Sequence, residues 1–189
     1  MLKKDARKLY RSERLRLSAQ EVIKLEDLLL IRFQMLPIPF ISVLFSFQPL
    51  VERNEIDPST ITRFLQFQNP GLMVAYPKIN VTDNFMQAIA CYDETEFRDN
   101  HLGIAEPVSD EEIDPQEIDM VLVPLLAFDE KGSRVGYGKG YYDAFLKQCR
   151  DDCIKVGLSY FEALPLIEDA SDFDVPLNYC ITPQKVYVF

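Results

Sequence analysis

Over the first 35 residues of the chain, hydrophobic side chains recur every three or four positions among charged ones. This spacing predicts one long helix or a broken pair of helices over residues 3–35. Ser18 followed by Glu21 is the pattern of a capping box, so a second helix is expected to begin there. Pro37 and Pro39 end the helical segment, because proline lacks the backbone donor that a helix needs.

Two further helices are expected later in the chain. Asp57 suits an N-cap and Pro58 the first helical position, and this helix should end near Asn69. The other helix is expected over 141–151, directly after a segment that is rich in glycine.

Between the helical segments lie short apolar runs that are typical of strands, several of them without a polar face. Alternation of such strands with helices predicts a three-layer α/β fold, with an open, largely parallel sheet and helices on both faces. We expect one domain over 1–189, since the sequence has no linker or repeat. The predicted strands are 40–47, 72–76 (ended by Pro77), 85–92, 120–126, 154–159, 179–182 and 186–189.

Composition narrows the function classes. The net charge of −10 argues against a nucleic-acid partner, whose phosphates such a surface repels. No apolar run is long enough to span a membrane, and the start lacks the apolar core of a signal peptide. The four cysteines and one histidine do not form a zinc pattern, so we expect reduced thiols in a cytoplasmic protein.

The most informative segment is 127–146, which carries four of the seven glycines. Such a loop can aim backbone N–H groups at an anion, and Arg134 and Lys139 add positive charge. Asp143 follows in the first helical turn, where it could hold Mg²⁺. The segment therefore predicts a phosphate cradle; the alternative is a hairpin or helix entry that uses glycine for its turn alone. The glycines are Gly132, Gly136, Gly138 and Gly140.

The glycine spacing differs from the common nucleotide loops. A Walker-type loop has a glycine five residues before its Gly-Lys pair, where this chain has Ser133, and Ser or Thr after that pair, where it has Gly140. The dinucleotide fingerprint also fails, because its third glycine is out of register.

The pattern Gly-x-Arg-x-Gly-x-Gly-Lys-Gly-Tyr-Tyr-Asp over 132–143 resembles the signature of the 5-formyltetrahydrofolate cyclo-ligase (methenyltetrahydrofolate synthetase) family. Further similarities follow in order along almost the whole chain: Lys3 with Arg7, Glu55-Ile56-Asp57, Glu106-Pro107 and Asp174-Val175-Pro176-Leu177. The resemblance implies an ATP- and Mg²⁺-dependent enzyme that converts 5-formyltetrahydrofolate to 5,10-methenyltetrahydrofolate with release of ADP and phosphate. It implies phosphorylation of the formyl oxygen followed by ring closure, and a monomer or weak homodimer.

The resemblance also implies roles for individual residues. Lys139, Arg134 and Tyr141 are implied in catalysis. ATP contacts are implied for Lys3, Arg7, Arg134, Gly136, Gly138, Lys139, Gly140, Tyr141 and Tyr142. Substrate contacts are implied for Phe45 or Phe47, Glu55, Glu106, Tyr137, Gly138, Lys139, Gly140 and Tyr141. Mg²⁺ is implied at Asp143 and Asp174, with Asp172 as the alternative to Asp174, and Glu106 has the alternative of fixing its turn.

Two positions depart from the family pattern. Leu125 stands where the family usually has glycine, and Tyr137 where it often has arginine. A leucine there would narrow the pocket or repack the end of the sheet, and the tyrosine removes one positive charge from the cradle. These departures keep open a non-catalytic folate- or nucleotide-binding protein on the same scaffold. A sugar-phosphate enzyme is a third reading, although it would have little use for Lys3 and Arg7.

Overall fold

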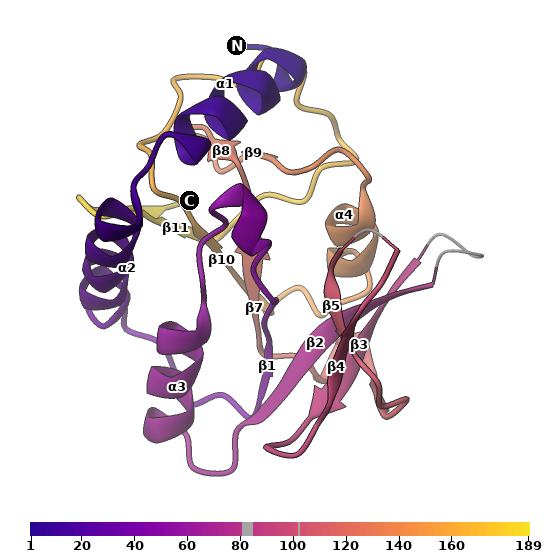
Figure 1. Ribbon diagram of the computed structural model, residues 1–189. Helices are drawn as coiled ribbons and strands as arrows, with labels where there is room; N and C mark the ends of the chain where they lie inside the picture. The colour runs from indigo at the N-terminus through magenta and orange to yellow at the C-terminus, as the bar shows by residue number, and fades with distance from the viewer. Residues whose placement is uncertain (81–84, 102) are drawn as a thin grey trace.

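The fold is organised around one mixed sheet, described by a computed structural model for residues 1–80, 85–101 and 103–189 (Figure 1). The order of its strands is β12-β11-β10-β7-β1-β2-β3-β6, and the pairs from β11 through β2 are all parallel. Antiparallel strands close both edges. The strands are β1 (Val43–Phe45), β2 (Met73–Asn80), β3 (Phe85–Cys91), β6 (Glu112–Ile113), β7 (Met120–Pro124), β10 (Ile154–Leu158), β11 (Tyr179–Ile181) and β12 (Val186–Val188).

Helices cover both faces of this sheet. Helices α2 (Ala19–Phe33) and α3 (Ser59–Gln68) pack their apolar sides on one face, where Phe33 and Leu65 join a buried cluster with Leu44. Helix α4 (Tyr141–Leu146) lies on the other face, where Phe145 packs against Phe45. The expected three-layer α/β architecture, largely parallel with helices on both faces, is confirmed.

Helix α1 (Lys3–Leu15) lies across one end of the molecule, beside the hairpin of β8 (Ala127–Phe128) and β9 (Arg134–Val135) (Figure 1). Its Ala6 is fully buried against Val135 and Leu164. Its start is also tied to a distant segment, since the Met1 amino group donates to the Leu166 carbonyl at 2.8 Å and the Lys3 N–H to Asp169 at 2.7 Å. The start of helix α1 is therefore fastened to residues 166–169, near the other end of the chain.

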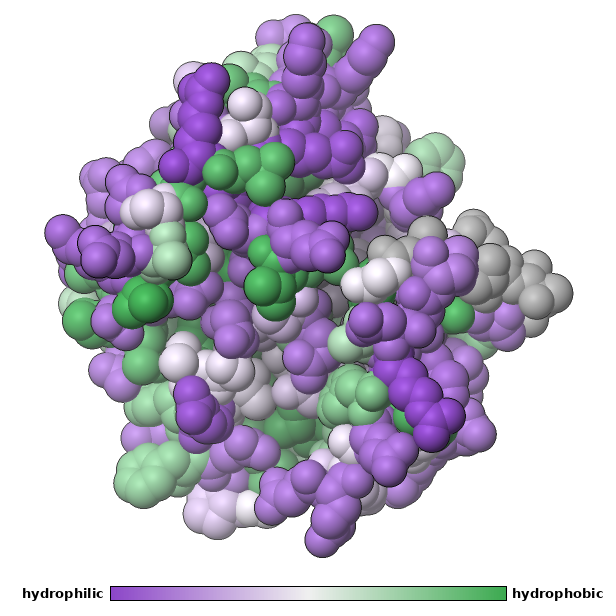
Figure 2. Space-filling view, viewed as in Figure 1, coloured by the Kyte–Doolittle hydropathy of each residue, from purple (hydrophilic) through white to green (hydrophobic). Residues whose placement is uncertain are grey.

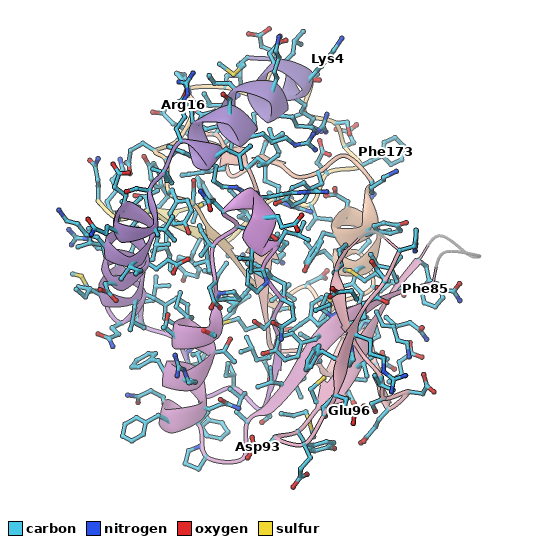
Figure 3. All side chains as sticks on the ribbon, in the orientation of Figure 1. Lys4, Arg16, Phe85, Asp93, Glu96 and Phe173 are labelled. Atoms are coloured by element: carbon cyan, nitrogen blue, oxygen red, sulfur yellow. The ribbon has the colours of Figure 1, made fainter. Side chains whose placement is uncertain are left out.

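The remaining elements are short. A ladder joins β4 (Phe97–Asp99) to β5 (Ala105–Pro107), and 3₁₀ turns occupy Val51–Arg53 (η1) and Pro115–Glu117 (η2). Hydrophilic side chains cover most of the face seen in Figure 2. Lys4 and Arg16, near the ends of α1, point outward into solvent in Figure 3. In the described part of the chain, no helix is long and apolar enough to cross a membrane.

Several expected elements are confirmed. The first helical segment is broken at Ser18, whose side chain accepts from the Glu21 N–H while Glu21 accepts from the Ser18 N–H, as a capping box requires. The third helix is found where Asp57 and Pro58 predicted it, but it begins at Ser59, so Pro58 is its N-cap rather than its first helical residue. The Asp57 carboxylate accepts from the Ser59 N–H at 2.8 Å, just before the helix.

Other boundaries were wrong. The first strand covers only Val43–Phe45 rather than 40–47, and Phe40 is 70% exposed. Helix α4 ends at Leu146 rather than near Asp151. Strand β2 continues through Pro77 to Asn80, paired with β3. Its pairing with β1 ends at Ala75, so no partner on that side needs an N–H from Pro77, and the strand tolerates the proline.

Candidate active site

A cavity of about 680 Å³ opens at the carboxyl ends of the parallel strands. Phe47 follows β1, Pro77 lies in the last part of β2, and Pro124 ends β7, and all three line it. One side of α1 and the glycine segment complete the wall. This is where ligands bind in open α/β sheets, as the order of the elements predicted.

The glycine segment forms a tight loop at the cavity wall. Gly138 and Gly140 have φ angles of 93° and 77°, in the region that only glycine enters freely. A Cβ atom on Gly138 would lie 3.3 Å from Cζ of Arg7, whose Nε donates to the Gly136 carbonyl at 2.9 Å. Arg7 therefore packs against the loop as well as lining the cavity. Because α4 has six residues, its dipole is small, and the attraction for an anion rests on the loop and the cations around it.

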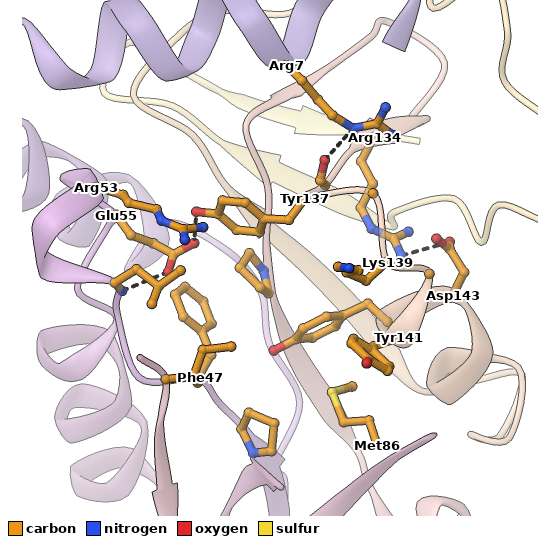
Figure 4. A pocket seen from close by; sticks show the side chains of 18 of the residues that line it. Arg7, Phe47, Arg53, Glu55, Met86, Arg134, Tyr137, Lys139, Tyr141 and Asp143 are labelled. Carbon is orange, nitrogen blue, oxygen red and sulfur yellow. Dashed lines mark hydrogen bonds and ion pairs between the residues drawn. The ribbon is translucent and has the colours of Figure 1, made fainter. Parts of the chain in front are cut away.

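Arg134 and Asp143 form an ion pair at one end of the cavity, drawn in Figure 4. Nη2 of Arg134 lies 2.8 Å from Oδ1 of Asp143, and the arginine is 5% exposed. The Val175 N–H also donates to Asp143 at 3.0 Å, and the Val175 carbonyl accepts from Arg134. Burial lowers the pKa of Arg134 from its ordinary value, and the charge of Asp143 opposes that shift. These bonds hold the Arg134 guanidinium at the cavity wall in a fixed orientation.

A second ion pair links the two ends of the chain. Nζ of Lys3 lies 2.5 Å from Oδ2 of Asp174, which also accepts from the Ser171 N–H at 2.7 Å. Burial alone would raise the pKa of Asp174, but its bonds with Lys3 and Ser171 lower it below its ordinary value. Asp174 lines the cavity, whereas Asp172 is exposed and does not, so the structure favours Asp174 of the two alternatives.

Glu55 lies at the opposite end of the cavity from the Arg134–Asp143 pair, on the far side of Tyr137 in Figure 4. It is 7% exposed and accepts from the Leu50 N–H at 2.8 Å and from the Tyr137 hydroxyl. Arg14 donates to that same hydroxyl. Burial and the charge of Glu55 raise the pKa of Tyr137 well above its ordinary value, so the phenol stays protonated and donates a hydrogen bond to Glu55.

Three arginines that the sequence reasoning missed surround Tyr137. The guanidinium carbons of Arg11, Arg14 and Arg53 lie 5.7, 5.8 and 5.7 Å from the centre of its ring. They supply positive charge near the position where the family often has arginine, so the charge that Tyr137 removes is offset by its neighbours. Arg11 and Arg14 continue the spacing of Lys3 and Arg7 along α1, and this helical periodicity was the signal that could have revealed them.

The aromatic candidates divide between core and cavity. Phe47 lines the cavity, whereas Phe45 is fully buried and stacks on Phe145 with ring centres 4.5 Å apart. Of these two alternatives the structure favours Phe47. Tyr141 and Tyr142 both line the cavity.

Glu106 is not among the residues that line the cavity. Its Oε1 accepts from the Ile79 N–H at 2.8 Å and from Nδ2 of Asn100 at 2.7 Å. It therefore ties the end of β2 to the loop before β5, which supports the alternative in which Glu106 fixes its turn.

Leu125 does not narrow the cavity. It is 4% exposed in the core, and its Cδ2 lies 2.7 Å from the place where a Cβ on Gly157 would be. Since Gly157 is on β10, next to β7, the missing side chain of one residue makes room for the added side chain of the other. The leucine repacks the end of the sheet.

The other candidate residues come together in this one cavity. Lys139 lies on its exposed side, and the part of the chain that the structure describes gives its side chain no ion pair. No group of three or more His, Cys, Asp or Glu side chains within the described residues forms a metal cluster. The candidate residues that line the cavity are Lys3, Arg7, Phe47, Glu55, Arg134, Gly136, Tyr137, Gly138, Lys139, Gly140, Tyr141, Tyr142, Asp143 and Asp174.

Comparison with known proteins identifies relatives. The chain is 39% identical over 70 residues to the 5-formyltetrahydrofolate cyclo-ligase of Mycoplasma genitalium, covering 36% of this chain and 42% of the relative. It is 36% identical over 134 residues to the probable 5-formyltetrahydrofolate cyclo-ligase of Schizosaccharomyces pombe, covering 61% and 64%. The matches thus span less than two thirds of these two curated relatives.

A solved structure extends the likeness over the whole chain. The 5,10-methenyltetrahydrofolate synthetase of Aquifex aeolicus superposes with a TM-score of 0.77 at 30% identity, covering 100% of this chain and 93% of that one. The model of the 5-formyltetrahydrofolate cyclo-ligase family matches residues 4–183. The cavity, the loop and the sheet described above therefore lie in a chain that belongs to the 5-formyltetrahydrofolate cyclo-ligase family.

Proposed function

We propose that this protein converts 5-formyltetrahydrofolate and ATP to 5,10-methenyltetrahydrofolate, ADP and phosphate. The observation that carries the proposal is one cavity with two different ends, in a chain of the cyclo-ligase family. One end has the glycine loop with Arg134 and Lys139, and the other has the buried carboxylate of Glu55 beside an aromatic wall. A folate with its polar ring at the Glu55 end and ATP with its triphosphate at the loop end would meet between the two ends.

At the Glu55 end, the site suits the pterin ring of a folate. A carboxylate accepts hydrogen bonds in pairs from adjacent N–H groups of such a ring. Phe47 lies next to Glu55 in the cavity and offers an apolar surface on which the ring can pack. Tyr137 already donates to Glu55, which keeps that carboxylate oriented before the substrate arrives.

At the glycine loop, the site suits phosphates. Lys139 has no acidic partner among the described residues, so its charge is available to a triphosphate. Asp143 and Asp174 offer the hard oxygen ligands that Mg²⁺ prefers, and two carboxylates suffice where phosphates and water complete the shell. Bound there, Mg²⁺ would neutralise charge on the phosphate oxygens.

The chemistry asks the protein mainly to position groups and to neutralise charge. Attack of the formyl oxygen on the γ-phosphorus forms a C–O–P linkage and releases ADP. The arylamine nitrogen then bonds to the formyl carbon, the C–O bond breaks with its electron pair on phosphate, and the N–H proton is released. Arg134 and Lys139 face the charge that develops on phosphate, and no histidine or cysteine nucleophile is needed.

The direct test mixes purified protein with 5-formyltetrahydrofolate and MgATP and follows the near-ultraviolet absorbance of the methenyl product. We expect a signal that requires both ATP and Mg²⁺. A flat trace from folded protein that still binds ATP would contradict turnover and would favour a binding protein on this scaffold. Leu125 gives that alternative no support, since it packs in the core.

We expect Asp143→Asn to raise the Mg²⁺ concentration that gives half the maximal rate by about tenfold or more, because it removes one of two charged ligands. The measurement is a titration of rate against Mg²⁺ at saturating ATP. Asp172→Asn is the matched control, since Asp172 is an exposed acid outside the cavity. An unchanged titration for Asp143→Asn would move the metal role elsewhere.

The same proposal includes a cytoplasmic protein that acts as a monomer or weak homodimer, without nucleic acid or membrane. The cavity is closed by α1 of its own chain, so a single copy carries all the residues assigned above. Light scattering across a range of concentrations tests the oligomeric state.

A further inference from the structure

One buried polar group in the cavity wall makes no hydrogen bond within the described part of the protein. The hydroxyl oxygen of Tyr142 is buried, and the described structure gives it no hydrogen-bond partner. Tyr142 itself lines the cavity, in the first turn of α4. Because a buried hydroxyl without a partner destabilises the folded protein, such a group in a cavity points to a partner that arrives from outside.

The position of this hydroxyl is set by the core. The Tyr142 ring packs against Phe45 of β1, with ring centres 6.2 Å apart, and Phe45 is fully buried. Two residues further along the chain, Phe47 lines the Glu55 end of the cavity. The phenol is therefore anchored beside the strand that leads to the proposed pterin site.

Charges from both ends of the cavity act on this hydroxyl. Burial raises the pKa of Tyr142 well above its ordinary value, the charge of Glu55 raises it further, and the charge of Arg134 opposes them. The phenol thus keeps its proton. It is a neutral donor in the same cavity as Glu55 of the proposed folate end and Arg134 of the proposed phosphate end.

The chemistry of the donor indicates the kind of acceptor. Arg134 and Lys139 line the cavity at the glycine loop, so the oxygens of a bound phosphate would have cationic partners there. A neutral phenol in an apolar setting matches a neutral carbonyl oxygen, which would otherwise be buried without a donor. The formyl group and the ring carbonyl of the folate are acceptors of this kind.

Resting on the proposed function, we propose that the Tyr142 hydroxyl donates a hydrogen bond to a carbonyl oxygen of the bound folate and so positions the formyl group between Glu55 and Arg134. The bond forms on binding and transfers no proton. It explains why the chain keeps a phenol where phenylalanine would satisfy the core.

The test is Tyr142→Phe, which removes the hydroxyl and keeps the ring. We expect the affinity for 5-formyltetrahydrofolate, measured by isothermal titration calorimetry, to fall about tenfold. ATP affinity should stay unchanged, and the melting temperature should stay equal or rise, because the orphaned group is gone. Turnover should fall along with folate binding.

Tyr160→Phe is the matched control. The Tyr160 hydroxyl is also in the protein interior, but it donates to Glu26 at 2.8 Å and lies outside the cavity. We expect this variant to lose thermal stability and to keep its folate affinity. The two phenols should thus show opposite signatures.

Each other outcome decides a different question. Unchanged folate affinity in Tyr142→Phe, while the wild type binds folate, overturns the inference. A drop in ATP affinity instead would assign the hydroxyl to the nucleotide, and a drop in stability like that of Tyr160→Phe would make it structural; both overturn it. A wild type that binds folate without turnover contradicts the proposed reaction alone, and one that does not bind folate contradicts both.

Discussion

Tyr137 shows how one residue can change the charge of a loop without changing the charge of the site. The glycine loop has a tyrosine where its family often has arginine, yet Arg11, Arg14 and Arg53 surround that ring. Its hydroxyl meanwhile joins Arg14 to Glu55. The tyrosine therefore acts as a scaffold for the acid that we assign to the pterin, while helix α1 and the 3₁₀ turn η1 supply the cations.

Lys139 should matter for turnover and not for stability. It is exposed and has no ion pair among the described residues, so Lys139→Ala removes no contact that holds the fold. Because we assign Lys139 to the charge that develops on the transferred phosphoryl group, we expect turnover to fall about 100-fold with an unchanged melting temperature. Lys4→Ala, on the outer side of α1, is the matched control and should keep full activity (Figure 3). An intact rate or a collapsed fold in Lys139→Ala would remove the assigned role.

At the scale of the elements, the neighbouring strands β7 and β10 are fitted to each other. Gly157 of β10 pairs in register with Val123 of β7, and the side chains of Leu125 and Leu177 fill the space beside it. A Cβ on Gly157 would lie 2.7 Å from each of these leucines. Real carbon atoms do not approach so closely, so the glycine is required by the packing of this particular chain.

This fit predicts a coupled pair of substitutions. Gly157→Ala should destabilise the protein by about 1–3 kcal/mol, because the added methyl overpacks a full core. Leu125→Ala should destabilise it by about 2–5 kcal/mol through the cavity that it leaves. The double variant should lose less free energy of unfolding than the sum of the two single losses, since the added methyl group can occupy space that the leucine leaves. Urea unfolding of all four proteins measures the coupling, and strict additivity would contradict the contact.

At the scale of the whole molecule, the two ends of the sheet have separate tasks. The carboxyl ends of the strands carry the cavity, whereas the amino ends are fastened by Asp119, just before β7. Its carboxylate accepts from the Ser42 and Val43 N–H groups at 2.7 and 3.0 Å, and from Arg150 at 2.8 Å. One side chain thus joins the starts of β1 and β7 to the segment after α4, far from the proposed chemistry.

Asp119→Asn should therefore change stability and its pH dependence while sparing the reaction. Burial alone would raise the pKa of Asp119, but the bonds with Arg150, Ser42 and Val43 lower it below the ordinary 3.8. A lowered pKa stabilises the fold above that value, and the effect is lost as pH falls below it. We expect the variant to lose about 1–3 kcal/mol at pH 7.

The deficit should shrink as the pH of urea unfolding falls below about 3.8, because the wild type then loses the same charge. Turnover per folded molecule at pH 7 should match that of the wild type. A deficit that is constant down to the lowest pH would show that the charge of Asp119 contributes nothing.

The sequence by itself determined the layers and the position of the cavity at the carboxyl ends of the strands, and its resemblance to the cyclo-ligase family supplied the candidate residues that line the cavity. The layers and the position depend on local signals, namely the period of the apolar residues, the capping box at Ser18 and the glycine spacing over 132–143. The same signals missed Arg11 and Arg14 beside Tyr137, although the helical spacing of these two residues was present along α1.

Only the tertiary structure placed Phe47 at the cavity and Phe45 in the core, packed Leu125 beside Gly157, and left the Tyr142 hydroxyl without a hydrogen-bond partner among the described residues. Each of these outcomes depends on which segments, far apart in the chain, come within a few ångströms of each other. The local pattern of a sequence specifies the elements and their order, while the distance between two side chains on different elements is set by how those elements pack. For this protein, that packing decided which residues face the cavity and which support it.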